Sequence, residues 1–353
     1  MHKQRPNRAK AAASAPNKII LAGEHSVVWG GLALSAPVEV ANRRNRASAR
    51  LFDGAGKIII RSKLGTTVLS GGKLSGSQSY GPIARAVLSG LGEKGAIGIL
   101  KGKDLIIELE PCGAPKGTGN SASLSAAAIC ASLGLAKRKT CGRELFSLVM
   151  PAEDGYHANK ASGIDPLTVC SDFAIVFKKR FGKSGAGFEA RKNRLSLPKG
   201  TALLLADSSR GGAAAATGEL INAFAKASGI SSLPGGLSWA ERKKVTAPFD
   251  SIVKSIVREL KPGGNAQRLG GLFDRNQELL RKAGVSSQSI EHVIRIAKKA
   301  GALGAKLTGA GGSGGSVLVL ARKKDAKKIR AMLEARGFAT YAIRFSQRGA
   351  CRA

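Results

Sequence analysis

The chain has 353 residues, of which 43% are hydrophobic and 23% charged, so it can bury a sizeable core and wholesale disorder is excluded. Lysine and arginine number 57 against 23 aspartates and glutamates. The resulting net charge of +34 favours anionic partners such as nucleic acid, a membrane surface or phosphorylated ligands. No apolar run approaches the roughly 20 residues of a membrane span, and the basic N-terminus lacks the apolar stretch of a secretory signal.

The cysteines and the distribution of basic residues narrow the possible locations and partners of the protein. The five cysteines form no C-x-x-C pair and are odd in number, which favours reduced thiols in a cytoplasmic protein. The basic residues are scattered along the chain, and no zinc-finger spacing or RNA-binding signature accompanies them. We therefore expect the charge to steer small anionic substrates, with no membrane partner. A basic nucleic-acid-binding protein is the alternative from a different class.

Residues 1–13 are basic and predict a flexible tail, after which residues 14–198 form the expected N-terminal domain. Short apolar runs predict strands in this domain at residues 18–22, 57–62, 103–110 and 172–179. Residues 64–77 are rich in glycine and serine and predict a loop. Residues 188–197 are expected to pair with a neighbouring strand.

A loop of glycines and prolines at residues 111–119 leads into a run of small apolar residues at 121–135. The run has apolar residues on nearly all sides, which predicts a buried helix. The start of a helix carries unpaired N–H groups and partial positive charge, and glycines let a ligand approach the backbone closely. The loop therefore suits a phosphate group, although an ordinary capped turn has the same local pattern.

A second helix is expected over residues 143–156, where apolar side chains recur at helical spacing. Glu153 lies near its end, and Asp165 ends the turn-rich stretch that follows. Two carboxylates that converge on a phosphate loop would suit Mg²⁺ binding and the activation of a hydroxyl group. Surface charge and helix capping are the ordinary alternatives for these two residues.

The composition shifts near Pro198, so we expect a C-terminal domain over residues 199–353 and an α+β fold. The chain ends with a predicted strand, helix and strand at residues 316–320, 325–335 and 340–345, an order that suits a ferredoxin-like sandwich. The glycine-rich residues 309–315 precede a strand instead of opening a helix. That context excludes a dinucleotide fingerprint. It leaves two alternatives, a flexible hairpin that could close over a ligand and a plain tight turn.

Four separated motifs agree in order and spacing with one known superfamily. They are APNKIILAGEHSVVWGGLALSAPV at residues 15–38, GTGNSAS at 117–123, Glu153 with His157 and SGID up to Asp165, and KLTGAGGSGGSVLVL at 306–320. On these motifs the chain resembles the GHMP kinase superfamily and, within it, the mevalonate kinase family. Thr118 and Asn120 depart from the leucine and serine that are usual in the second motif.

The resemblance implies a two-domain GHMP kinase fold, with a ribosomal protein S5 domain 2-like N-terminal domain and a ferredoxin-like C-terminal domain. ATP and an acceptor would bind in the cleft between them. The implied activity is the Mg²⁺-dependent transfer of a phosphoryl group from ATP to the 5-hydroxyl of mevalonate, in isoprenoid precursor biosynthesis. Another GHMP kinase, acting on phosphomevalonate, a sugar or an amino-acid hydroxyl, is the alternative, and a homodimer is left open.

The resemblance also implies roles for particular residues. Asp165 and Lys18 would be catalytic: Asp165 would accept the hydroxyl proton or orient the hydroxyl, and Lys18 would stabilise the charge on the alkoxide and the γ-phosphate. Ser121 and Glu153 would bind Mg²⁺, a hard cation that prefers oxygen ligands.

The remaining implied contacts concern the two substrates. The acceptor would contact Glu24, His25 and Gly311. The implied ATP-binding residues form the loop before the small-residue helix and the start of that helix: Gly113, Gly117, Thr118, Gly119, Asn120, Ser121, Ala122 and Ser123.

Overall fold

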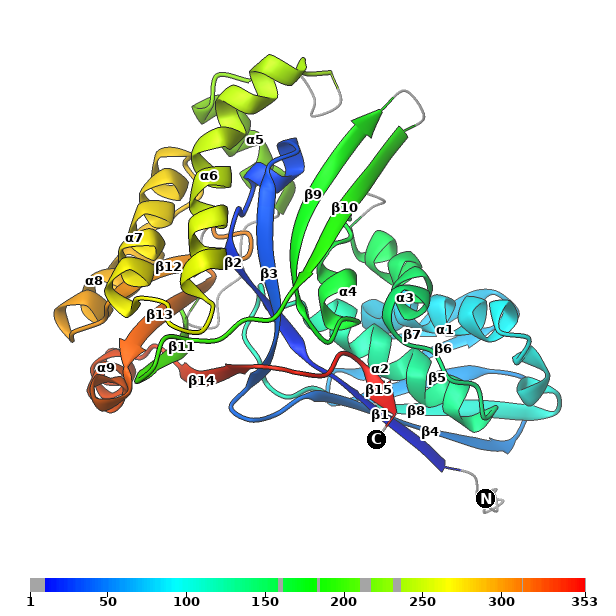
Figure 1. Cartoon of the computed structure of the whole chain (residues 1–353). Coiled ribbons are helices and arrows are strands. Elements are labelled where there is room, and N and C mark those ends of the chain that lie inside the picture. The colour runs from blue at the N-terminus through cyan, green and yellow to red at the C-terminus, as the bar shows by residue number, and fades with distance from the viewer. Residues whose placement is uncertain are drawn as a thin grey trace.

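The described part of the chain assembles into two β-sheets with helices packed against them (Figure 1). This computed structural model describes residues 10–157, 161–182, 185–209, 217–230, 236–312 and 314–352. The mixed content of helices and strands confirms the expected α+β class. None of the helices in these ranges is long and apolar enough to cross a membrane.

The first sheet runs in the order β15-β1-β4-β8-β5-β6-β7. Its strands are β1 (Lys10–Ala15), β4 (Asn45–Asp53), β5 (Ile58–Ser62), β6 (Gly65–Ser70), β7 (Lys73–Gly76), β8 (Lys103–Glu110) and β15 (Cys351–Arg352). Alternate residues of β4 and β5, such as Ala49 and Ile60, are buried, as expected for a sheet with one covered face. The helices packed into the same core are α1 (Gly81–Glu93), α2 (Asn120–Leu135) and α3 (Gly142–Tyr156).

Two predictions for this half of the chain were wrong. Residues 64–77 are not a loop, because β6 and β7 form an antiparallel hairpin that extends the sheet from β5. The turn between them is formed by Gly71 and Gly72, both in the left-handed backbone region that glycine adopts without strain. Residues 10–13 are part of β1 and pair with β4, while residues 1–9 of the expected tail lie outside the described residues.

The second sheet runs in the order β10-β9-β3-β14-β11-β13-β12, and β2 also pairs with β3. Its strands are β2 (Asn17–Ala22), β3 (Leu32–Val40), β9 (Ala174–Gly182), β10 (Gly185–Asn193), β11 (Thr201–Asp207), β12 (Gly304–Thr308), β13 (Ser316–Arg322) and β14 (Thr340–Phe345). The domain boundary predicted near Pro198 falls between β10 and β11, and β3 pairs with β14 across it. One sheet therefore joins the two halves of the chain.

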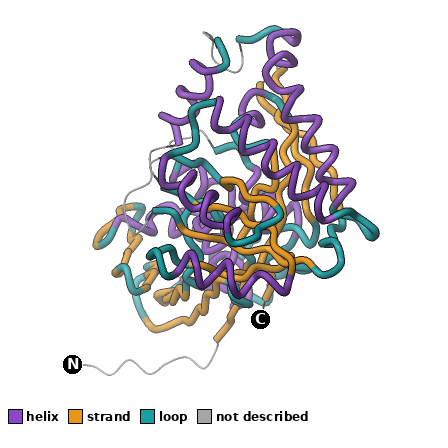
Figure 2. Tube along the Cα trace, turned by 90° about the vertical axis from the view of Figure 1, so that its left-hand side faces the viewer, coloured by secondary structure: helices purple, strands orange, loops and turns teal. Residues whose placement is uncertain are grey.

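The helices of the C-terminal half pack against the second sheet. They are α5 (Thr217–Ala227), α6 (Trp239–Glu259), α7 (Ala266–Lys282), α8 (Gln288–Lys299) and α9 (Lys323–Glu334). The predicted strand, helix and strand at the end of the chain are confirmed as β13, α9 and β14. The last strand, β15, then pairs with β1, so both ends of the described chain lie at the same end of the molecule (Figures 1 and 2).

Helix α2 runs through the interior of the molecule, which confirms the predicted buried helix. Every residue from Ala122 to Gly134 is buried, and these side chains are mostly alanine and serine. Small side chains let β1 and β4 approach the helix closely, and the buried serines donate hydrogen bonds to backbone carbonyls of the preceding turn or of β1. The start of this helix therefore has a fixed position relative to β1 and β2.

Candidate functional site

The start of α2 faces a cavity of about 430 Å³. The cavity is lined by stretches of chain that lie far apart in the sequence. They are β2 and the turn after it, the loop before α2 and the start of that helix, the end of α3, the residues around α4 (Ile164–Val169), Ile221 of α5 and the glycine-rich loop after β12. The predicted site residues among its lining are Lys18, Glu24, His25, Gly117, Gly119, Asn120, Ser121, Glu153, Asp165 and Gly311.

Lys18 and Asp165 form an ion pair at this cavity, with 3.0 Å between Lys18 Nζ and Asp165 Oδ1. Lys18 extends from β2, and only 4% of its side chain is exposed, against 26% for Asp165. Asp165 lies in the first turn of α4, after Gly163 in the left-handed conformation that opens this helix. A carboxylate in the first turn of a helix interacts favourably with the partial positive charge there. A lysine and a carboxylate from distant segments therefore meet at one point of the cavity.

Gly119 lets the loop before α2 lie directly against this ion pair. A β-carbon at Gly119 would lie 2.8 Å from Lys18 Cγ and 3.6 Å from Asp165 Oδ2. The first of these distances is shorter than real carbon contacts allow, so any larger residue displaces the lysine. The loop, the lysine and the carboxylate are thus one packed unit.

We expect Gly119→Ala to lower kcat by about ten- to a hundredfold, because small displacements of reacting groups cost that much. Gly102→Ala is the matched control: both glycines have a positive φ and share the backbone strain, but no described atom lies within 4 Å of a β-carbon at Gly102, and Gly102 does not line the cavity. Steady-state kinetics of the two purified variants checks the prediction. Equal turnover in both would show that the contact with Lys18 is unimportant.

Glu153 brings a second carboxylate to the cavity. It lies on α3 and is 1% exposed, and its Oε1 atom has no hydrogen-bond partner within the described residues. Its Oε2 atom lies 3.6 Å from Nε2 of His157, and this carboxylate raises the pKa of His157 above its ordinary value. A buried, unpartnered carboxylate oxygen is a costly feature that a bound cation would satisfy.

Ser121, at the start of α2, lines the same cavity as Glu153. Hydroxyl and carboxylate oxygens suit Mg²⁺, which is usually bound by one or two carboxylates together with substrate phosphates. The described residues contain no cluster of three or more His, Cys, Asp or Glu side chains that would hold a metal by themselves. The donor set therefore fits a Mg²⁺ ion that enters with a nucleotide.

The predicted ATP-binding residues divide into two groups. Gly117, Gly119, Asn120 and Ser121 line the cavity, whereas Gly113, Thr118, Ala122 and Ser123 are not among its described lining residues.

The side chains of Thr118, Asn120 and Ser123 hold the loop in place. Thr118 Oγ1 donates to the carbonyl of Pro115 (2.6 Å), and Ser123 Oγ donates to the carbonyl of Ala15 (3.1 Å). Asn120 Oδ1 accepts from Asn17 Nδ2 (2.7 Å). Contacts to a ligand from this segment must therefore come mainly from its backbone.

The glycine-rich loop after β12 lies against the loop before α2. A β-carbon at Gly309 would be 3.0 Å from Gly117 Cα, and one at Gly311 would be 2.3 Å from the carbonyl oxygen of Val285. Both glycines have positive φ angles. Only glycine allows these close approaches, so the glycine pattern reflects packing of this loop against Gly117 on one side and Val285 on the other.

Glu24 lines the cavity, and its carboxylate is paired with other residues of the chain. Its side chain is fully buried, and its carboxylate forms an ion pair with Lys306 and accepts from Asn276 Nδ2 (3.1 Å). Burial lowers the pKa of Lys306, and the Glu24 carboxylate counteracts this effect. Lys306 belongs to the motif at residues 306–320, but the motif predicts no role for it. The only feature in the sequence that could have drawn attention to Lys306 is its position ahead of an apolar run that predicts a strand.

His25 lies at the edge of the cavity in a strained conformation with φ of 58°. Its Nε2 atom donates to the carbonyl of Ala310 (2.7 Å), and its ring stacks on Phe224 with 5.9 Å between the centroids. Burial lowers the pKa of His25, so the ring is neutral at pH 7. His25 therefore ties the turn after β2 to the glycine-rich loop as a neutral donor.

Sequence comparisons find related proteins along most of this chain. A family model described as GHMP kinases C terminal matches residues 252–339. A mevalonate kinase from Archaeoglobus fulgidus is 32% identical over 303 residues, which cover 86% of this chain and 89% of that protein.

Two solved structures show the breadth of the fold. The L. major mevalonate kinase in complex with R-mevalonate is 22% identical with a TM-score of 0.73, covering 97% of this chain and 99% of that one. The Lactococcus lactis galactokinase complexed with galactose is 20% identical with a TM-score of 0.73, covering 98% and 96%. The expected GHMP kinase fold is confirmed, but equal TM-scores for two acceptor types mean that the fold does not select the acceptor.

Proposed function

Since this chain belongs to the mevalonate kinase family of GHMP kinases, we propose that it transfers the γ-phosphoryl group of ATP to the 5-hydroxyl of mevalonate. The product would be 5-phosphomevalonate, a precursor in isoprenoid biosynthesis. The observation that carries the proposal is the Lys18–Asp165 ion pair beside the glycine loop at the start of α2. The free state of all five cysteines, which lie within the described ranges, suits a cytoplasmic location.

Phosphoryl transfer requires mainly positioning and neutralisation of charge. In this proposal Asp165 accepts a hydrogen bond from the acceptor hydroxyl, orients it, and takes its proton late in the reaction. Lys18 stabilises the negative charge that develops on the attacking oxygen and on the transferred group. The 3.0 Å between their charged atoms supports a shared task at a single reacting oxygen.

The start of α2 is the proposed phosphate site. No side chain of the described residues caps this helix at Gly119, so its first N–H groups stay available for phosphate oxygens. Gly117, Gly119 and the neighbouring Lys116 line the cavity at this helix start. Backbone donors and the helix dipole together suit a triphosphate.

Glu153 and Ser121 would hold Mg²⁺, which when bound neutralises phosphate charge. We expect Glu153→Gln to raise the Mg²⁺ concentration needed for half-maximal turnover, because the amide keeps the shape but loses the anionic oxygens. Activity measured across a Mg²⁺ titration checks this, with Glu108→Gln, an exposed partner of Arg61, as the control. A Mg²⁺ titration curve identical to that of the unaltered protein would count against Glu153 as a ligand.

A phosphorylated acceptor is the second candidate, because Lys116 adds a positive charge to the cavity lining beside Lys18. Turnover with ATP and a panel of mevalonate, phosphomevalonate, galactose and homoserine separates these acceptors. The proposal expects mevalonate to give the highest kcat/KM. A higher kcat/KM for phosphomevalonate would contradict the proposal and identify a phosphorylated molecule as the acceptor.

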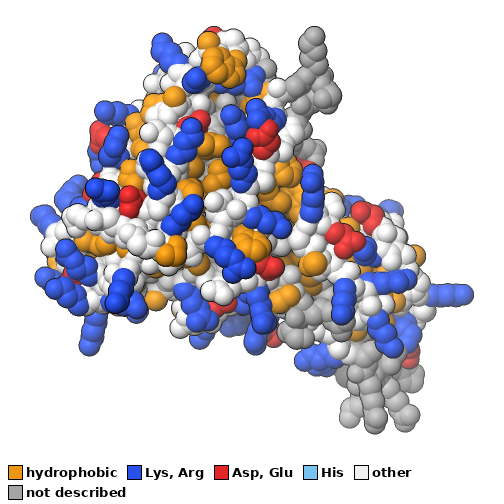
Figure 3. Space-filling view, in the orientation of Figure 1, with side chains coloured by type: hydrophobic (Ala, Val, Ile, Leu, Met, Phe, Trp, Pro, Cys, Tyr) orange, Lys and Arg blue, Asp and Glu red, His pale blue; other side chains and the backbone are white. Residues whose placement is uncertain are grey.

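Nucleic-acid binding is the alternative from another class, raised by the net charge of +34. On the face shown in Figure 3, lysine and arginine side chains are spread over all visible elements, with acidic side chains between them. A dispersed pattern of this kind suits long-range steering of anions better than a nucleic-acid groove. Salt-dependent RNA binding without phosphoryl transfer would favour the alternative instead.

A further inference from the structure

The chain ends in a segment that crosses from the second sheet back to the first. We name residues 346–352 the C-terminal strap. It includes β15, which pairs antiparallel with β1, Ser14 lying opposite Cys351 (Figure 1). The strap follows β14 directly, and no strap residue is among the described residues that line the cavity. Any influence on the reaction must therefore pass through the elements that it contacts.

One of those elements is α4, the short helix that carries Asp165. The backbone N–H of Ala350 donates to the carbonyl of Val169, and that of Gly349 donates to Asp172 Oδ1, both at 2.8 Å. A β-carbon at Gly349 would lie 2.7 Å from the backbone carbonyl carbon of Cys170. The strap thus lies in direct backbone contact with the end of α4 and the residues that follow.

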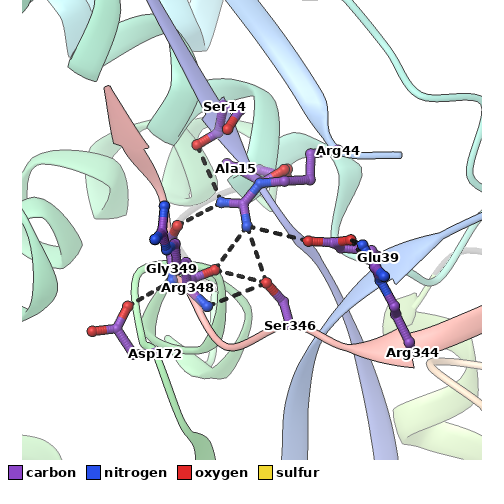
Figure 4. Close-up of polar contacts among 10 residues, drawn as sticks. Ser14, Ala15, Glu39, Arg44, Asp172, Arg344, Ser346, Arg348 and Gly349 are labelled. Carbon is purple, nitrogen blue, oxygen red and sulfur yellow. Dashed lines mark hydrogen bonds and ion pairs between the residues drawn. The ribbon is translucent and has the colours of Figure 1, made fainter. Parts of the chain in front are cut away.

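Arg44 joins the same strap to β1 (Figure 4). Its guanidinium donates to the carbonyls of Arg348 (3.0 Å) and Gly349 (2.6 Å), to Ser346 Oγ (3.0 Å) and to the carbonyl of Ser14 (3.5 Å). The planar fork of arginine can satisfy several acceptors at once in fixed directions, which lysine cannot do. One side chain therefore connects three points of the strap with the strand that precedes Lys18.

These contacts join the two segments that carry the ion pair. Ser14, at the end of β1, is four residues before Lys18, and Val169, at the end of α4, is four residues after Asp165. Both positions are hydrogen-bonded to the strap or to Arg44. The chain from Ser14 to Lys18 passes from β1 to β2 at Pro16, and the chain from Asp165 to Val169 is a single helix. The strap and Arg44 therefore make contacts within four residues of both Lys18 and Asp165.

We propose that the C-terminal strap and Arg44 are positioning elements. They hold β1 and α4 at the spacing that keeps Lys18 Nζ within ion-pair distance of the Asp165 carboxylate. The inference rests on the proposed function for its kinetic consequence, but the position of Lys18 can be measured without any substrate. Arg44 and Gly349 are the key residues, the first through its hydrogen bonds and the second through its close approach to Cys170.

Kinetics of Arg44→Met and Gly349→Ala form the first part of the test. We expect kcat to fall by about ten- to a hundredfold with an unchanged KM for ATP, since the phosphate loop is not altered. Arg344→Met is the control for Arg44, because both arginines form ion pairs with Glu39 and Arg344 is exposed. Gly92→Ala is the control for Gly349, because a β-carbon there has no described atom within 4 Å. Unchanged kcat in both strap variants would overturn the proposal.

Chemical labelling of lysines, followed by mass spectrometry, forms the second part. Lys18 and Lys306 are both buried in the intact protein, so both should label slowly. In the strap variants we expect faster labelling of Lys18 while Lys306 stays protected. Equal acceleration at both lysines would indicate general loosening of the fold and contradict a positioning role. If the unaltered protein does not phosphorylate mevalonate, the proposed function fails, while the labelling still decides whether the strap positions Lys18.

Discussion

Asp165→Asn is expected to lower kcat by about 10²–10⁴-fold, the range usual for the loss of a general base. The amide has the same shape, but it accepts no proton and leaves Lys18 without its counter-charge at 3.0 Å. The KM for ATP should change little, because the phosphate loop and the start of α2 remain intact. Steady-state kinetics with saturating Mg²⁺ checks both parameters.

Asp325→Asn provides the control for this variant. Asp325 lies on the surface helix α9 and is 3.8 Å from Arg322, far from the reaction in the proposed scheme. It should keep the kcat of the unaltered protein. Near-normal turnover in Asp165→Asn would remove Asp165 from the mechanism, and a fall in both variants would point to a general loss of folded protein.

Lys306→Met is expected to lower the free energy of unfolding by about 3–5 kcal/mol, since it leaves the fully buried Glu24 without its counter-charge. The double variant Glu24→Gln, Lys306→Met should recover part of that loss, because the remaining amide is uncharged. Chemical denaturation of the single and double variants measures both values.

The control for Lys306 is Lys282→Met, which removes an exposed ion pair with Glu278. Exposed pairs contribute at most about 1 kcal/mol, so this variant should be nearly as stable as the unaltered protein. A similar small loss for Lys306→Met would mean that the buried pair does not hold the turn after β2 in place.

The sequence motifs predicted which residues lie at the cavity, but they did not predict every ion pair that these residues form with distant parts of the chain. Lys18 was predicted from the first motif, Glu153 and Asp165 were predicted from the third, and all three line one cavity. The two carboxylates could be singled out because acidic residues are scarce in this chain. The partner of Glu24 could not be predicted. Lys306 is 282 positions away, and only the packing of β12 beside β2 brings the two charges together.

For the fold, too, elements that depend on local sequence patterns could be predicted, whereas pairings between distant segments could not. The buried helix α2 and the final strand, helix and strand follow local patterns of apolar residues, and these predictions are confirmed. The hairpin of β6 and β7 was missed because its glycines and serines resemble a loop, while its pairing with β5 supplies the missing stability. The pairing of β3 with β14 and of β1 with β15 joins residues that no local pattern connects.

Phosphorus NMR of the purified protein with Mg-ATP and mevalonate tests the central claim most directly. The account predicts that the γ-phosphate signal of ATP is replaced by a phosphomonoester signal coupled to the methylene protons of carbon 5, in step with ADP formation. A phosphate ester on the tertiary 3-hydroxyl, or ATP that stays intact over many hours with mevalonate present, would contradict it.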